Sequence, residues 1–186
     1  KNFRPKRFNQ YAFYPSVGSS GGIITIWNNN HFSGRVISMN YLHITIEFIL
    51  TMDNTKWYFT NVYGPNLEEG KLEFTTWMKN LNISACKYWM LLGDFNFIRA
   101  PENRNKVGGD HNSMMTFNSI IINLDLMEIP LKGRTFTWSN MQECPLLEKL
   151  DWIFTSSDWI NDHPNTLAFP MVKISSDHVP IKVQVD

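Results

Sequence analysis

The chain has 186 residues, a length that fits one domain, and we expect that domain to span residues 1–186. Hydrophobic residues make up 43% of the chain and aromatic residues 14%, a composition that argues against disorder. The 17 basic and 17 acidic residues cancel, which argues against strong non-specific binding to nucleic acid.

Cysteine usage and hydropathy indicate the cellular compartment in which such a chain is expected. Cys86 and Cys144 form neither a CxxC pair nor a disulfide framework, which is typical of a reducing compartment. We therefore expect an intracellular location, in the nucleus or the cytoplasm. No apolar run reaches transmembrane length, so we expect no membrane partner.

The predicted elements begin with strands. A flexible turn over residues 18–22 leads into a β-rich segment at 23–27, and a second strand is predicted at 32–39. Residues 42–50 alternate between apolar and polar side chains, which is the period of a half-buried strand. A hairpin-type turn then precedes a further strand at 57–63.

Helices are predicted in the middle of the chain. Apolar residues at helical spacing indicate one helix between Leu72 and Leu81 and another between Met114 and Leu124. About nine strands and two main helices favour an α/β fold, in which a two-layer β-sandwich is flanked by helices. The remaining strands are predicted at residues 88–92, 136–138, 150–154, 167–171 and 181–185.

A polar motif, Gly93-Asp94-Phe95-Asn96, follows the apolar strand at 88–92. A carboxylate and an amide two residues apart, just past a strand end, can point into one cleft. There they can bind water, a metal ion or a phosphate oxygen. Without further context, an Asx turn is the simpler interpretation.

Two later segments carry matching chemistry. Asp177 beside His178 suits metal ligation or stabilisation of a phosphoryl transition state, although a polar turn would also explain the pair. Asp151 lies in an apolar strand, where it needs either a structural partner or a histidine that it orients. The convergence of these residues with Asp94 and Asn96 at strand ends is more specific than any single motif.

Taken in order, the motifs GDFN, KLDWIF and SDHVPI resemble the DNase I-like endonuclease/exonuclease/phosphatase superfamily. The segments GSSGGIITIWN, NVYGPN and LKGRTFTWSN look like the apurinic-type endonuclease domain of plant LINE-type (non-long-terminal-repeat) retrotransposons. The resemblance runs from about Gly18 to Val185. It implies a DNase I-like α/β fold, DNA as the partner and Mg²⁺ or Mn²⁺ as the cofactor.

The resemblance also implies roles for the first group of residues. Asp94 would orient and deprotonate the attacking water, and Asn96 would hold the scissile phosphate. Tyr63 of the NVYGPN segment would contact the phosphate or a metal-bound neighbour. A carboxylate-held cation would offset charge on the phosphate and activate the water.

The resemblance implies further roles for the later residues: a metal ligand, a group that stabilises the phosphate in the transition state, and part of the wall that faces DNA. Asp177 would be a metal ligand, and His178 would stabilise the pentacovalent phosphate. Asp151 would pair with His178 and fix its orientation. Thr137 or Trp138 of the LKGRTFTWSN segment would line the wall that faces DNA.

The start of the chain departs from the family pattern. Family members open with a strand that carries an Asn, in a pattern like W-N-x-R-G, followed by a Gln-Glu-Thr motif whose Glu is the principal metal ligand. Neither pattern occurs here. We therefore expect an N-terminally incomplete domain that lacks its first strands and binds Mg²⁺ or Mn²⁺ weakly or not at all. A protein partner or a dimer mate would then cover the strands left exposed.

Two functions stay open at this point. The first is a retrotransposon-derived, Mg²⁺-dependent phosphodiesterase or DNA endonuclease domain with impaired or lost catalysis, which the downstream site residues favour. The second is a non-catalytic module that keeps the same fold to bind protein or nucleic acid. The zero net charge and the missing Glu favour the second.

Overall fold

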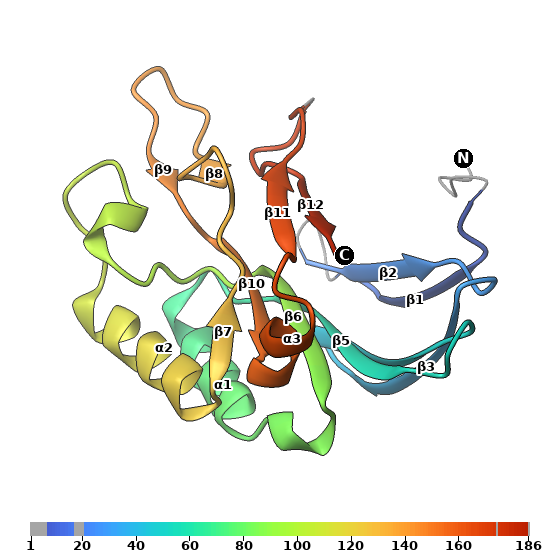
Figure 1. Cartoon of the computed structure of the whole chain (residues 1–186). Coiled ribbons are helices and arrows are strands. Elements are labelled where there is room, and N and C mark those ends of the chain that lie inside the picture. The colour runs from blue at the N-terminus through green and yellow to red at the C-terminus, as the bar shows by residue number, and fades with distance from the viewer. Residues whose placement is uncertain (1–6, 17–20, 174, 186) are drawn as a thin grey trace.

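The fold is that of a computed structural model, which describes residues 7–16, 21–173 and 175–185. Residues 18–20 of the predicted glycine turn lie outside this part of the chain. One large sheet forms the centre, with the two longer helices on one face and two separate strand pairs and a short third helix on the other (Figure 1). The predicted α/β architecture with layered sheets and flanking helices is confirmed.

The large sheet has six strands in the order β3-β4-β5-β6-β10-β7. Strands β5 and β6 run parallel, whereas the other neighbours are antiparallel. Helix α1 (Glu68–Lys79) makes the crossover that a parallel pair requires. The strands are β3 (Phe32–Met39), β4 (His43–Leu50), β5 (Lys56–Tyr63), β6 (Tyr88–Asp94), β7 (Leu126–Glu128) and β10 (Asp151–Ser156).

Both predicted helices are confirmed, and each begins earlier than its apolar stripe. In α2 (His111–Asn123), the Asp110 carboxylate accepts hydrogen bonds from the backbone N–H groups of Asn112 and Ser113 and so fixes the start. The two helices cover one face of the sheet, where Phe74, Phe117 and Phe154 are fully buried. No helix in the described ranges is long and apolar enough to cross a membrane.

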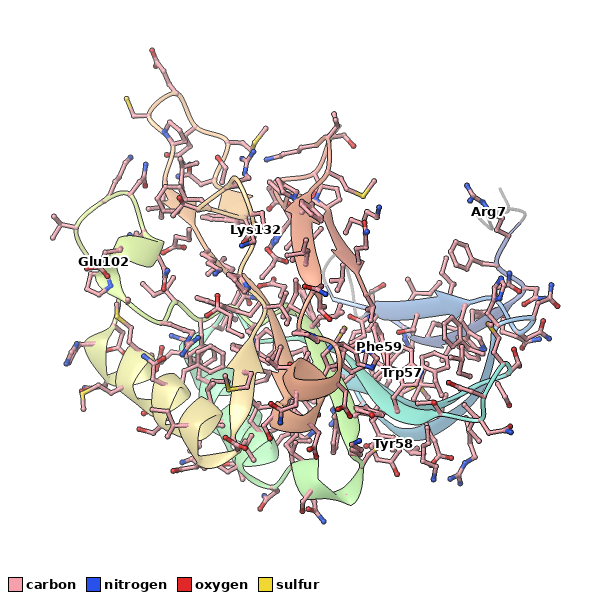
Figure 2. The ribbon with its side chains drawn as sticks, viewed as in Figure 1. Arg7, Trp57, Tyr58, Phe59, Glu102 and Lys132 are labelled. Carbon is pink, nitrogen blue, oxygen red and sulfur yellow. The ribbon has the colours of Figure 1, made fainter. Side chains whose placement is uncertain are left out.

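Alternation along each strand separates the two faces of the large sheet. On β5, Trp57 and Phe59 lie on the face toward the strand pairs, whereas Tyr58 lies on the helix face (Figure 2). On β6, Met90 packs with the strand pairs, and its neighbour Leu91 packs under the helices. The core therefore consists of one cluster under the helices and separate clusters under the strand pairs.

The second layer is divided into two strand pairs. The antiparallel pair β1 (Gln10–Tyr14) and β2 (Ile23–Trp27) packs over β4 and β5. The antiparallel pair β11 (Leu167–Pro170) and β12 (Ile181–Gln184) packs over β6 and β10. Short elements complete the chain: β8 (Trp138–Ser139) with β9 (Leu147–Glu148), helix α3 (Ser157–Asp162), and the 3-10 turns at Ile83–Ala85 and Pro101–Asn103.

Two details of the sequence prediction were wrong. Strand β4 is buried on both faces, because Glu47, only 6% exposed, is paired with Lys56 at 2.7 Å and with Arg35 at 2.9 Å. The strand predicted at residues 136–138 is reduced to the two residues of β8. Strands β1, β7 and β9 were not predicted.

Replacing Phe117 with Ala tests whether the helix-face cluster holds the fold. We expect the free energy of unfolding to fall by about 3–5 kcal/mol, because a fully buried ring leaves a cavity. The matched control is Met115→Ala on the same helix, where the side chain is 58% exposed and the expected loss is below about 0.5 kcal/mol. Equal losses in urea unfolding would contradict this assignment of the core.

Candidate active site

Three candidate residues lie side by side because of strand register. At the end of β5, Tyr63 pairs with Asp94 at the end of β6. On the other side of β6, Asp151 at the start of β10 pairs with the same Asp94. Backbone pairing therefore brings residues from three distant parts of the sequence into one row.

Glycines allow the strand ends to approach this closely. Gly93 has φ 140°, and a Cβ added there would lie 2.1 Å from the carbonyl oxygen of Val62. A Cβ on Gly64 would lie equally close, 2.1 Å, to the carbonyl oxygen of Phe95. A side chain at either position would push β5 and β6 apart at the row of candidate residues.

Successive side chains of the loop after β6 lie alternately in the core and in the candidate site. Phe95 is fully buried and Phe97 is 3% exposed, so both anchor the loop under the helices. Between them, Asn96 has a left-handed backbone with φ 55°. Its backbone N–H donates to Asp94 Oδ1, and its amide Nδ2 donates to Asp94 Oδ2 at 2.9 Å and to the Gly64 carbonyl at 2.8 Å. The predicted phosphate-holding amide is thus already engaged within the site.

His178 approaches the row from the segment before β12. Its Nδ1 lies 2.8 Å from Asp151 Oδ2, and because a carboxylate can only accept, Nδ1 is the donor. The other ring nitrogen, Nε2, lies 3.7 Å from Asp94 Oδ2. The predicted pairing of Asp151 with His178 has the geometry of a carboxylate that orients an imidazole.

The proximity of these groups shifts their proton affinities. Burial, together with the negative charge of Asp151, raises the pKa of Asp94 to about 7. Burial opposes a charge on His178, but the hydrogen bond and charge of Asp151, with the charge of Asp94, raise its pKa above the ordinary value. The site therefore holds protons near neutral pH that isolated groups would release.

Oxygen and nitrogen atoms of Asp94, Asp151 and His178 lie within 4.8 Å of one another, close enough to hold a metal ion. Asp177, the predicted metal ligand, is not in this group. Its carboxylate accepts a hydrogen bond from Trp138 Nε1 at 2.9 Å, which lowers the pKa of Asp177. The ligand set that the geometry offers is therefore different from the one expected from sequence.

The other predicted residues occupy distinct environments. Thr137 is fully buried, so the expectation that it lines a DNA-facing wall was wrong for this residue. Trp138 is half-buried beside Asp177, and Tyr63 is half-buried, with its ring 3.9 Å from where a Cβ of Gly21 would lie. Lys173, which the sequence did not single out, donates to the Asp177 carbonyl at 2.9 Å.

Comparison with known proteins identifies the architecture. No protein-family model matches the sequence, and no curated protein matches it. Among solved structures, the endonuclease domain of TRAS1, a telomere-specific non-LTR retrotransposon, aligns with a TM-score of 0.72 and 11% identity, over 97% of this chain and 82% of that one. This chain has the DNase I-like fold. Two further solved structures have the same fold. The APE2 catalytic domain of Xenopus laevis aligns with a TM-score of 0.67 and 15% identity, over 98% of this chain and 76% of that one. The AP endonuclease LMAP of Leishmania major aligns with a TM-score of 0.66 and 15% identity, over 93% of this chain and 69% of that one.

The raised pKa of Asp94 predicts a pH-dependent stability. Unfolded, this carboxyl group titrates near pH 3.8, whereas folded it titrates near pH 7. Between these values the folded state binds a proton that the unfolded state releases, so stability falls as pH rises, by up to about 1.4 kcal/mol per pH unit. The raised pKa of His178 adds a loss of the same sign above its unfolded value.

Urea unfolding from pH 5 to pH 8 checks this prediction in the wild-type chain and in Asp94→Asn. The variant carries no titrating group at this position, so its stability should fall less over this range than that of the wild type. Parallel pH profiles for the two proteins would mean that Asp94 is not perturbed.

Proposed function

We propose that this chain is a metal-dependent phosphodiesterase that cleaves DNA. The observation that carries the proposal is the cluster in which Asp94, Asp151 and His178 meet. A carboxyl group with a pKa near 7 can accept a proton at neutral pH, and an imidazole oriented by a carboxylate can carry one. Proteins of similar fold include an AP endonuclease and a retrotransposon endonuclease domain, which supports DNA as the substrate.

In the proposed reaction, Asp94 removes a proton from the attacking water. Protonated His178, held by Asp151, offsets the charge that develops on the phosphate oxygens. Asn96 orients the scissile phosphate once its amide releases one of its present acceptors. Tyr63 borders the same row of residues, and the half-exposed Trp138 ring is the remaining candidate for contact with DNA.

A divalent cation suits this donor set. Mg²⁺ is commonly held by one or two carboxylates together with substrate phosphates, and Asp94 and Asp151 supply two. Asp177 can join them only by giving up its bond to Trp138. When bound, such a cation neutralises phosphate charge and lowers the pKa of water.

We propose further that catalysis is impaired and that the domain descends from a plant LINE-type retrotransposon. Two clustered carboxylates give weak affinity for a hard cation, since ligand charge sets much of that affinity. The similarity to the TRAS1 domain over nearly all of this chain supports the retrotransposon origin. The segments NVYGPN and LKGRTFTWSN, which contain Tyr63 and Trp138, support the plant LINE-type assignment.

Nicking of supercoiled plasmid by the purified chain, with Mg²⁺ or Mn²⁺ and with EDTA, tests the proposal. We expect slow, metal-dependent nicking that Asp94→Ala and His178→Ala each reduce by about 10²-fold or more, because general acid–base groups contribute on this scale. Asp158→Asn, an exposed acid on α3, is the matched control and should nick like the wild type. Nicking that survives both site substitutions, or no nicking at all, would overturn the proposed activity.

A second candidate function, a protein-binding module, is favoured by the divided second layer. Two largely apolar hollows adjoin β12 and the residue just after it. One, of about 330 Å³, is lined by Leu92, Ile153 and Ile181 together with Asp151 and His178 of the candidate site. The other, of about 500 Å³, is lined by residues that include Trp57 and Val185.

A free strand edge borders these hollows. Strand β11 is bridged to Leu131 on its far side, which leaves the outer edge of β12 without a paired strand among the described residues. An extended segment with alternating apolar side chains could pair with the free edge of β12 and fill the hollows. We propose a protein partner or a dimer mate as its source.

Dye binding and sedimentation test the second candidate. We expect the wild-type chain to bind 8-anilinonaphthalene-1-sulfonate and to self-associate as its concentration rises, because apolar surface is accessible. Val185→Glu places a charge in the larger hollow and should reduce both effects. Val172→Glu, at an 85% exposed position outside the hollows, is the control and should change neither. A monodisperse monomer that binds no dye would contradict this function.

A further inference from the structure

We propose that Thr137 is a positioning residue, which holds Asp151 and His178 in register for the reaction proposed above. Its side chain is fully buried, yet it is polar. Its side chain meets the candidate cluster through the backbone N–H of Asp151 and has no exposed surface, so it cannot act on a substrate directly. Its hydrogen bonds instead join the two segments that carry the paired residues.

The first link runs to the start of β10. Thr137 Oγ1 accepts hydrogen bonds from the backbone N–H groups of Leu150 and Asp151, both at 3.0 Å. One hydroxyl oxygen thereby fixes the two successive peptide N–H groups that lead up to the Asp151 side chain. The Thr137 N–H donates to the Glu148 carbonyl at 2.9 Å and continues the same attachment.

The second link runs to the segment that carries His178. The Thr137 carbonyl accepts a hydrogen bond from the Val179 N–H at 2.8 Å, immediately after the histidine. The next residue, Trp138, forms an isolated antiparallel bridge with His178. The Ser139 N–H donates to the Asp177 carbonyl at 3.1 Å. Residues 137–139 are therefore bonded on one side to the Asp151 segment and on the other to the His178 segment.

The arrangement depends on the hydroxyl oxygen of Thr137 and not on the shape of its side chain. Leu150 and Asp151 meet the Thr137 oxygen in the interior, so an apolar side chain of the same shape would leave two buried N–H groups without their acceptor. The backbone would then shift at Asp151. A displacement of about 1 Å at a reacting group can cost about 10²-fold in rate.

Three substitutions at Thr137 separate positioning from simple support of the fold. Thr137→Val keeps the shape and removes the acceptor, Thr137→Ser keeps the acceptor, and Thr137→Cys supplies a weak one if the valine variant does not fold. Thr155→Val is the matched control, because Thr155 is also fully buried, lies on β10, and makes only a 3.4 Å hydrogen bond to the Met127 carbonyl.

Two measurements on the full chain test whether Thr137 positions Asp151 and His178. The first is the downfield NMR resonance of the His178 Nδ1 proton, which reports its hydrogen bond to Asp151 at a fixed pH. The second is metal-dependent plasmid nicking, resolved into kcat and KM. We expect Thr137→Val to move or abolish the resonance and to lower kcat about 10- to 100-fold with little change in KM. Thr137→Ser should restore both, and Thr155→Val should affect only stability.

The two proposals fail in different ways. If the wild-type chain does not nick, the proposed function fails, but the resonance still tests the role of Thr137. If Thr137→Val leaves the His178 resonance in place, and slows nicking no more than Thr155→Val does, the positioning role is overturned. A serine variant that behaves like the valine variant would overturn it as well.

Discussion

Backbone pairing between neighbouring strands places Asp94 in the middle of a row of three candidate residues, whatever contacts their side chains make. The parallel register of β5 and β6 sets Tyr63 on one side of it, and the antiparallel register of β6 and β10 sets Asp151 on the other. The row forms only because Gly64 and Gly93 let the two parallel strands close to a distance that a Cβ would forbid. The close approach of Tyr63, Asp94 and Asp151 depends on that closure.

Bringing two carboxylates together in a half-buried place has an electrostatic consequence. Asp94 and Asp151 repel each other, so the folded chain compensates with a proton on Asp94, with positive charge on His178, or with a cation. Each means of compensation suits phosphodiester chemistry, which requires a proton acceptor and a positive centre beside a phosphate. The repulsion between the two carboxylates also lowers the stability of the folded chain as the pH rises. The chemistry of the site and the pH dependence of stability therefore have the same cause.

Local patterns in the sequence predicted the strands and helices that have strong periodicity, and the motifs around Asp94, Asp151 and His178 predicted which residues would meet. Register was not predictable, since it depends on the pairing of strands far apart in the chain. Burial of Glu47 was missed because its compensating charges, Lys56 and Arg35, lie on neighbouring strands. Thr137 was placed at a DNA-facing wall, since no local signal distinguishes a surface threonine from one that accepts backbone hydrogen bonds inside the fold.

The central claim is that Asp94, Asp151 and His178 act as one cation-dependent site, and paramagnetic broadening by Mn²⁺ tests it most directly. Titrating Mn²⁺ into the ¹⁵N-labelled chain should broaden the backbone amide signals of residues 94–96, 151 and 178 first. Asp94→Asn should weaken that effect strongly, while Glu102→Gln, at an exposed position of the Pro101–Asn103 turn, should leave it unchanged. Broadening centred elsewhere, or identical in wild type and Asp94→Asn, would contradict a cation site built on these residues.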